Sequence, residues 1–139
     1  MTSPPSHRER VRFLEFEFSR LPNGRCRARV VLERQPEERF VGVAEGLGSQ
    51  TGELRCAAAA ATDALAHTVP DEVGLELLGV KAVRAFDSTV VIVSLSCHNG
   101  VPATRLVGSC ITEDEVNRSA ALAVLNATNR FLGNVIFTR

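Results

Sequence analysis

Arg55-Cys-Ala-Ala-Ala-Ala60 falls on Arg118-Ser-Ala-Ala-Leu-Ala123 when the chain is aligned with itself so that position 55 meets position 118. This shift, which we call the repeat offset, also places Asp63-Ala64 on Asn126-Ala127. Both alanine-rich stretches have the composition of a helix. The match predicts two copies of one supersecondary unit, because a unit of this size cannot bury its apolar face alone and two units packed together can close a core.

The first copy is predicted to hold three strands followed by a helix. Leu14, Phe16 and Phe18 alternate with polar residues, which is the period of a half-buried strand. Pro70 lies beyond the expected end of the helix. The expected elements are strands over residues 14–19, 27–33 and 39–45 and a helix over residues 53–68.

The first turn also predicts a strand register. Pro22-Asn23-Gly24 is a turn sequence whose first two residues suit a type I turn and whose glycine suits the left-handed position after it. A three-residue loop here pairs Leu21 with Arg25 and places Glu17 opposite Arg29. Such a cross-strand charge pair contributes about 0.2–1 kcal/mol and needs no functional explanation.

The same order of elements returns in the second copy. Thr112 and Glu115 form a capping-box motif, so a helix is expected to start there and to run to about Leu132. Gly133 stands where a C-terminal cap belongs. The expected strands cover residues 74–83, 90–95 and 103–108.

The expected fold class is therefore α+β. Two tandem βββα units are related by a pseudo-two-fold axis, and their antiparallel sheets pack against the two helices. Residues 1–9 have the composition of a disordered tail. Residues 10–139 are expected to form a single domain made of the repeats 10–72 and 73–135.

Composition and charge narrow the classes of function. Sixteen basic and 16 acidic side chains give a formal charge of zero, which argues against nucleic-acid binding and favours a protein that assembles with a partner. Arg25, Arg27 and Arg29 share one strand, but glutamates are expected opposite them. No apolar stretch resembles a leader peptide or reaches the roughly 20 residues of a membrane span. We expect a cytoplasmic protein with no membrane partner and with reduced cysteines.

The connections that precede the two helices are the candidate ligand-binding sites. Helix N-termini present unpaired amides and a positive dipole end, which suit carboxylates. Asp114 is placed to take an amino group while amides of the other unit take a carboxylate. Ordinary turn and cap chemistry is the alternative explanation. The candidate residues are Gly46 and Gly48 in the first unit and Gly108, Ser109, Thr112 and Asp114 in the second.

Residues with catalytic or metal-binding chemistry form no recognisable motif. His67 is expected at a helix end and His98 in a turn beside Cys97. Neither histidine has a carboxylate or nucleophile at a familiar spacing, and no Cys-x-x-Cys pair is present. A metal site built from Cys97, His98 and Cys110 is disfavoured for the same reason. We expect no catalytic residue, no metal and no cofactor.

Three stretches resemble a known family. Arg27–Glu33, Ala44-Glu-Gly-Leu-Gly48 and Arg118–Phe131 resemble the second strand, the first glycine-containing loop and the last helix of one regulatory domain. That domain is the C-terminal regulatory, or dimerisation, domain of 2-isopropylmalate synthase and citramalate synthase. The likeness covers about residues 11–132. It implies a homodimer that binds leucine, isoleucine or a related small carboxylate and that regulates a partner enzyme.

The chain also departs from that family. Gly48-Ser-Gln-Thr-Gly52 stands where the family tends to have Gly-Pro-Val-Asp-Ala, and the His-x-His metal site of those synthases has no counterpart. A catalytic (β/α)₈ barrel needs roughly 200 residues or more, so none fits in this chain. The expectation is a free-standing, non-catalytic domain that binds an amino-acid-like ligand. The alternative is a scaffold or interaction subunit that binds no ligand.

Overall fold

The computed structural model describes residues 10–34, 37–98, 102–132 and 135–137, and its elements follow the predicted order. Two antiparallel three-stranded arrangements each lead into one helix, so the α+β fold with repeated βββα-like units is confirmed. The predicted cap at Gly133 lies outside the described residues. The elements are β1 (Arg10–Leu21), η2 (Pro22–Gly24), β2 (Arg25–Arg34), β3 (Glu38–Leu47), α1 (Gln50–Ala66), β4 (Gly74–Ala85), β5 (Ser88–His98), β6 (Thr104–Thr112), α2 (Val116–Leu132) and β7 (Val135–Phe137).

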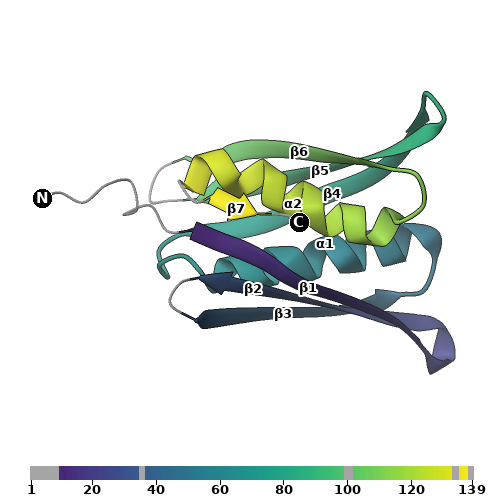
Figure 1. The fold of residues 1–139 in the computed structure, drawn as a ribbon, viewed down its shortest axis with the longest axis horizontal. Helices are drawn as coiled ribbons and strands as arrows, with labels where there is room; N and C mark the ends of the chain where they lie inside the picture. The colour runs from purple at the N-terminus through teal and green to yellow at the C-terminus, as the bar shows by residue number, and fades with distance from the viewer. Residues whose placement is uncertain (1–9, 35–36, 99–101, 133–134, 138–139) are drawn as a thin grey trace, which may run out of the picture.

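The two helices lie between two sheets (Figure 1). One sheet has the order β3-β2-β1-β7 and the other has the order β4-β5-β6. Helix α1 packs on β2 and β3, α2 packs on β5 and β6, and the helices also contact each other. The short strand β7 runs parallel to β1, a pairing that no sequence pattern predicted. Each sheet therefore has one face on the helices and one outer face.

The predicted register of the first hairpin is confirmed. Leu21 pairs with Arg25 and Glu17 pairs with Arg29. The predicted type I turn is wrong, because Asn23 as well as Gly24 has a positive φ, at 64° and 71°. Asparagine is one of the few non-glycine residues that adopt this left-handed conformation readily.

A β-bulge changes which residues of β1 face the core. The register shifts between Phe13 and Glu15, so Leu14 is an extra residue and Phe13 takes the inward position. Phe16 and Phe18 face inward as predicted, half-buried against the core. The same alternation turns Arg20 toward the helices.

Both helices end close to the predicted residues, but their starts differ: α2 begins at Val116, after the predicted capping box. Helix α1 starts at Gln50, ahead of the predicted start at Glu53, because the Ser49 hydroxyl accepts a hydrogen bond from the Gly52 amide. Strand β6 also extends to Thr112, beyond the predicted end at Gly108. The connection predicted over residues 46–52 therefore shrinks to Gly48 and Ser49.

One glycine in each unit lets the helix of that unit lie directly on its sheet. A Cβ atom on Gly42 of β3 would collide with the backbone of Ala60 and Ala64 in α1. A Cβ atom on Gly108 of β6 would collide with the backbone of Ala123 and with Ala127 in α2. The alanine residues of both helices follow from this close approach, because larger side chains would hold helix and sheet apart.

The two copies consequently follow two different offsets. The helices and central strands correspond at the repeat offset. The third strands, β3 and β6, do not, because that offset carries Gly42 onto Arg105. The structural equivalent of Gly42 is Gly108. Asp63 and Asn126 keep the repeat offset, and each bonds to the strand residue after the glycine. Asp63 accepts a hydrogen bond from the Val43 amide, and Asn126 donates one to the Ser109 carbonyl.

We predict that Gly42→Ala and Gly108→Ala each lower the free energy of unfolding by about 3 kcal/mol or more, since an added methyl group forces a helix backbone away from its sheet. Gly46→Ala is the matched control, because an added Cβ on this residue of the same strand would meet its nearest atoms only at 3.7 and 3.8 Å. Urea denaturation followed by circular dichroism measures all three variants. Equal stability of Gly42→Ala and Gly46→Ala would contradict the close-approach argument.

Candidate functional site

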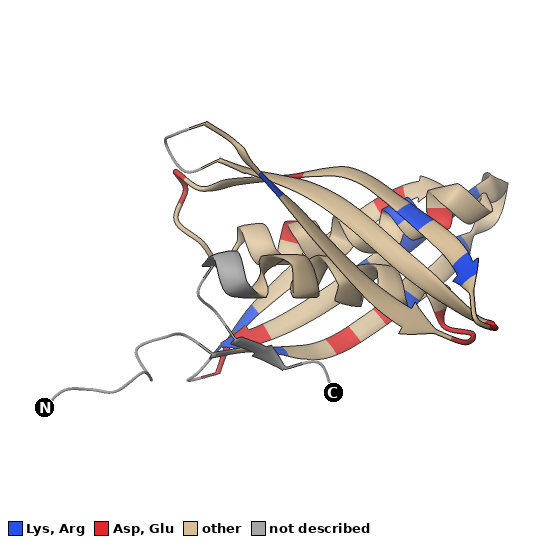
Figure 2. Ribbon diagram, turned by 90° about the horizontal axis from the view of Figure 1, so that it is seen from above, with Lys and Arg blue, Asp and Glu red and all other residues tan. Residues whose placement is uncertain are grey.

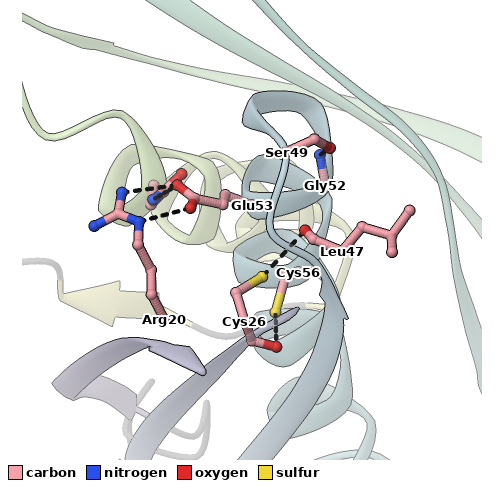
Figure 3. A network of polar contacts seen from close by, with 8 residues as sticks. Arg20, Cys26, Leu47, Ser49, Gly52, Glu53 and Cys56 are labelled. Carbon is pink, nitrogen blue, oxygen red and sulfur yellow. Dashed lines mark hydrogen bonds and ion pairs between the residues drawn. The ribbon is translucent and has the colours of Figure 1, made fainter. Parts of the chain in front are cut away.

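The N-terminal ends of both helices meet the end of β1 in a partly buried polar junction, in which Glu53 is buried and Arg20 is exposed (Figure 3). Arg20 donates two hydrogen bonds to the Glu53 carboxylate, from Nε to Oε2 at 2.8 Å and from Nη2 to Oε1 at 3.0 Å. Asn117 Nδ2 donates to the same Oε1 at 3.2 Å. Three elements, β1, α1 and α2, are thereby tied to one carboxylate. Only 8% of Glu53 is exposed.

The protonation of Glu53 follows from these partners. The hydrogen bonds from Arg20 lower the pKa of the Glu53 carboxyl below its ordinary value, and burial opposes that effect. Asn117 lowers the pKa further by donating to the same carboxylate. The junction therefore holds an ionised carboxylate at neutral pH.

The Ser49 cap of α1 has a counterpart at Thr112, which lies in a turn ahead of α2 and does not cap that helix directly. The repeat offset carries Ser49 onto Thr112, and each hydroxyl accepts a hydrogen bond at 3.0 Å, from the Gly52 amide and the Glu115 amide respectively. The predicted forward bond to Thr112 is thus present. Among the described residues the Glu115 carboxylate makes no bond back to Thr112, and helical structure begins only at Val116. Asp114 therefore lies in the loop ahead of the helix.

A groove beside the junction runs between β1 and the start of α2, and we call it the α2 groove. Its volume is about 310 Å³. The rings of Phe16 and Phe18 form an apolar wall, and carboxylates and a guanidinium stand on the helix side. Arg118 is half-buried, with its guanidinium 5.1 Å from the centre of the Phe13 ring. The lining residues are Phe16, Phe18, Asp114, Glu115, Val116, Asn117 and Arg118.

A second groove, of about 250 Å³, lies between the end of β3 and the start of α1. It includes the predicted Gly46, but its charged side chains are already engaged. Glu45 binds Arg27 at 2.7 Å, and Arg55 donates to the Leu77 carbonyl at 3.3 Å. Gly48 lies outside this lining and donates its amide to the Gly24 carbonyl at 2.7 Å. This groove offers fewer free polar groups than the α2 groove.

The six predicted binding residues do not gather in one place. Gly108 and Ser109 lie under the middle of α2, where they serve helix–sheet packing and a hydrogen bond from Asn126. Thr112 ends β6 and closes the turn ahead of α2, and Gly46 and Gly48 lie close to the start of α1. Asp114 alone among the six lines the α2 groove.

Sequence reasoning missed the junction, although the repeat contained a signal for it. The repeat offset carries Glu53 onto Val116 and Leu54 onto Asn117. Each pair exchanges a polar residue for an apolar one at a position that faces the other helix. Positions where a repeat changes polarity inside its packing face are therefore the places to look for a site.

The described cysteines and histidines do not form a reactive or metal-binding group near the helix starts. Cys56 is buried next to Cys26, and burial raises the pKa of its thiol to about 12, so a reactive thiolate does not form there. Cys97 is also buried, whereas the adjacent His98 is exposed and contacts Ser96 on the opposite face of β5. Within the described ranges no three such side chains gather into a metal-binding group.

Comparisons with known proteins add no assignment. A scan against protein-family models finds no matching family, and a search of curated proteins finds no matching relative. No helix in the described part of the chain has the length and apolar character needed to cross a membrane.

We predict that Glu53→Gln lowers the free energy of unfolding by about 1–2 kcal/mol at pH 7, because it removes the charge from two hydrogen bonds with Arg20. The folded-state pKa of Glu53 lies below its unfolded value. Its contribution is therefore complete above the unfolded pKa, near 4.3, and is lost as the pH falls through the folded pKa. Denaturant titrations from pH 7 to pH 3 should show the two proteins converging.

Glu45→Gln is the control for that series. Glu45 also binds an arginine, Arg27, but its side chain is 40% exposed, so its loss should cost less than about 1 kcal/mol. A Glu53→Gln deficit that stays constant down to pH 3 would show that the carboxylate charge does not stabilise the junction.

Proposed function

We propose that this protein is a non-catalytic regulatory domain that binds an apolar amino acid in the α2 groove and acts as a homodimer. The observation that carries the proposal is the composition of the groove, which places two phenyl rings beside two carboxylates and one guanidinium. An apolar α-amino acid has the complementary groups: an aliphatic side chain, an ammonium and a carboxylate. The sequence resemblance to the leucine-responsive regulatory domain supports the same ligand class.

Each group of the ligand has a matching partner in this arrangement. The carboxylate would pair with Arg118, which forms no ion pair within the described part of the chain and can bind a carboxylate through two N–H donors. The ammonium would pair with Asp114, whose side chain is exposed and which likewise has no described ion pair. A branched aliphatic side chain would then cover Phe16 and Phe18.

A binding function fits the groove better than catalysis does. Its lining contains no cysteine, histidine, serine or lysine. Ligand binding there would instead act on structure, because Asn117 lines the groove and also holds Glu53 in the junction. A ligand that orders Asn117 would stabilise the contact between the two repeats, which is a route to regulating an attached or partner enzyme.

We predict that leucine, isoleucine or valine raises the melting temperature of the protein. At a ligand concentration of about 100 Kd the folded state gains about 2.7 kcal/mol. Leucinamide lacks the carboxylate and N-acetyl-leucine lacks the ammonium, so both should stabilise far less. Differential scanning fluorimetry over amino acids and 2-keto acids measures the effect, and a flat profile would contradict the proposal.

Asp114→Asn tests the location of the site. It should weaken amino-acid binding at least tenfold in isothermal titration calorimetry, because the ammonium loses its counter-charge. Glu113→Gln is the matched control, since this neighbouring acidic residue is exposed and does not line the groove. Equal affinities of the two variants would place the ligand elsewhere.

A second candidate function is that of a scaffold or interaction subunit that binds no ligand. The observation that favours it is a set of exposed apolar side chains on the outer face of the β4-β5-β6 sheet, with Val107 63% and Ile111 68% exposed. A stable assembly that shows no thermal response to any amino acid would support this function over the first.

A further inference from the structure

The outer faces of the two sheets differ in polarity, although Val41 and Val43 on β3 are also exposed. On the first sheet Arg27 pairs with Glu45, and Arg29 contacts both Glu15 and Glu17. On the second sheet the equivalent cross-strand pair is Val90 with Ile111, which is apolar. Figure 2 looks onto this second sheet from above, and its strands are tan along most of their length.

Two of the sheet edges are engaged by helix side chains. Asp63 accepts the amide hydrogen of Val43 on the β3 edge, and Asn126 donates to the carbonyl of Ser109 on the β6 edge. Both bonds use backbone groups that an added strand would need. Association through the face of a sheet is therefore less obstructed than association through these edges.

We propose that the outer face of the β4-β5-β6 sheet binds the same face of a second copy of this chain, about a two-fold axis parallel to β5. This surface specifies the homodimer of the proposed function and rests on that function. The axis places β4 of each copy over β6 of its partner, with the rows of paired residues kept in line.

Charge complementarity selects this axis. Glu76 and Arg105 flank Ser96 on the outer face, in one row of the sheet. Both are exposed, and neither has an ion pair within the described residues. The proposed axis brings Glu76 of each copy to Arg105 of the other, which makes two equivalent ion pairs. An axis perpendicular to the strands would instead place Glu76 at the other end of the strand, over Val83.

Shape complementarity points to the same arrangement. Gly79 and Val107 flank Ser94 in the next row, and they line a shallow groove of about 460 Å³ on this face. The axis sets the protruding Val107 of one copy over Gly79 of the other, where no atom fills the space above the glycine. At the far end of the sheet, Val83 lies over Ile111 of the partner copy.

The area of the face is sufficient for a dimer. Three strands about 4.8 Å apart, with eleven residues in β5 at about 3.4 Å each, give a face of roughly 500 Å². Two copies therefore bury about 1,000 Å² in total, which lies in the range of weak, transient interfaces and below the roughly 1,200 Å² at which stable ones begin. We expect a weak dimer that dissociates on dilution.

Charge reversal provides the test, with sedimentation equilibrium of the full chain as the measurement. Glu76→Arg and Arg105→Glu should each raise the dimer dissociation constant at least tenfold, because each homodimer then holds two like-charge contacts. Mixing the two single variants should restore association, because the heterodimer regains both attractive pairs. An ion pair within one copy could not be restored by mixing, so failure of the mixture to associate would overturn the proposed axis.

Val107→Lys and Val41→Lys test the face itself. The two valines immediately precede the equivalent glycines Gly108 and Gly42, and they occupy matching outward positions on the two sheets. Only Val107→Lys should dissociate the dimer, and circular dichroism melts confirm that both variants fold. A wild-type chain that is monomeric at several hundred micromolar, or a dimer equally insensitive to both substitutions, would overturn the proposal.

The ligand proposal and the dimer proposal can be refuted separately. A dimer that ignores every amino acid contradicts the ligand proposal and leaves this surface standing. A monomer that responds to leucine contradicts the surface and leaves the α2 groove standing.

Discussion

The close approach of each helix to its sheet is the constraint on which the rest of the structure depends. Gly42 and Gly108 let the helix backbone rest on the third strand of each unit, and no other residue type leaves that space. A helix at this distance can present only small side chains to the sheet, so alanine fills the contact faces of α1 and α2. The same small side chains let the helices contact each other between the sheets. The larger fully buried side chains come from the strands, as with Leu32 and Leu95, and from the helices, as with Leu65 and Leu125.

The junction of Arg20, Glu53 and Asn117 is where the two copies stop being equivalent. A strictly symmetric repeat would place the same residue at positions 53 and 116, on two helix starts that lie close together. Two glutamates there would repel each other, whereas two valines would leave Arg20 without a partner. One carboxylate that accepts hydrogen bonds from an arginine and an amide avoids both problems, and it requires the two repeats to differ.

Local sequence patterns were enough to predict much of the fold. Most of the candidate site depends on contacts between distant parts of the chain, which those patterns do not show. The turn at Pro22-Asn23-Gly24 was enough to predict the register of β1 and β2, because loop length and face matching leave one solution. The bulge at Leu14 could not be predicted, since alternation continues on either side of an inserted residue. Gly108 is predicted at the junction of a short strand and a helix-start loop, whereas β6 continues to Thr112. The third strands follow a different offset, which moves this glycine under the middle of α2.

The two repeats resemble each other at positions that pack against the helices and differ at positions that face outward. Positions that face the helices have kept their character, as the pairs Val30–Val93 and Gly42–Gly108 illustrate. Outward positions are free of that constraint, yet they did not diverge into two similar polar surfaces. One sheet joins several of its outward charges in ion pairs among its own strands, beside the exposed Val41 and Val43. The other exposes Val107 and Ile111 more fully, and its Glu76 and Arg105 have no ion pair within the described chain. Exposing apolar area to water costs free energy that nothing inside the second unit returns. A surface of that kind is stabilised when another surface covers it, and in the proposed dimer a second copy of the chain presents the same face with opposite charges in register.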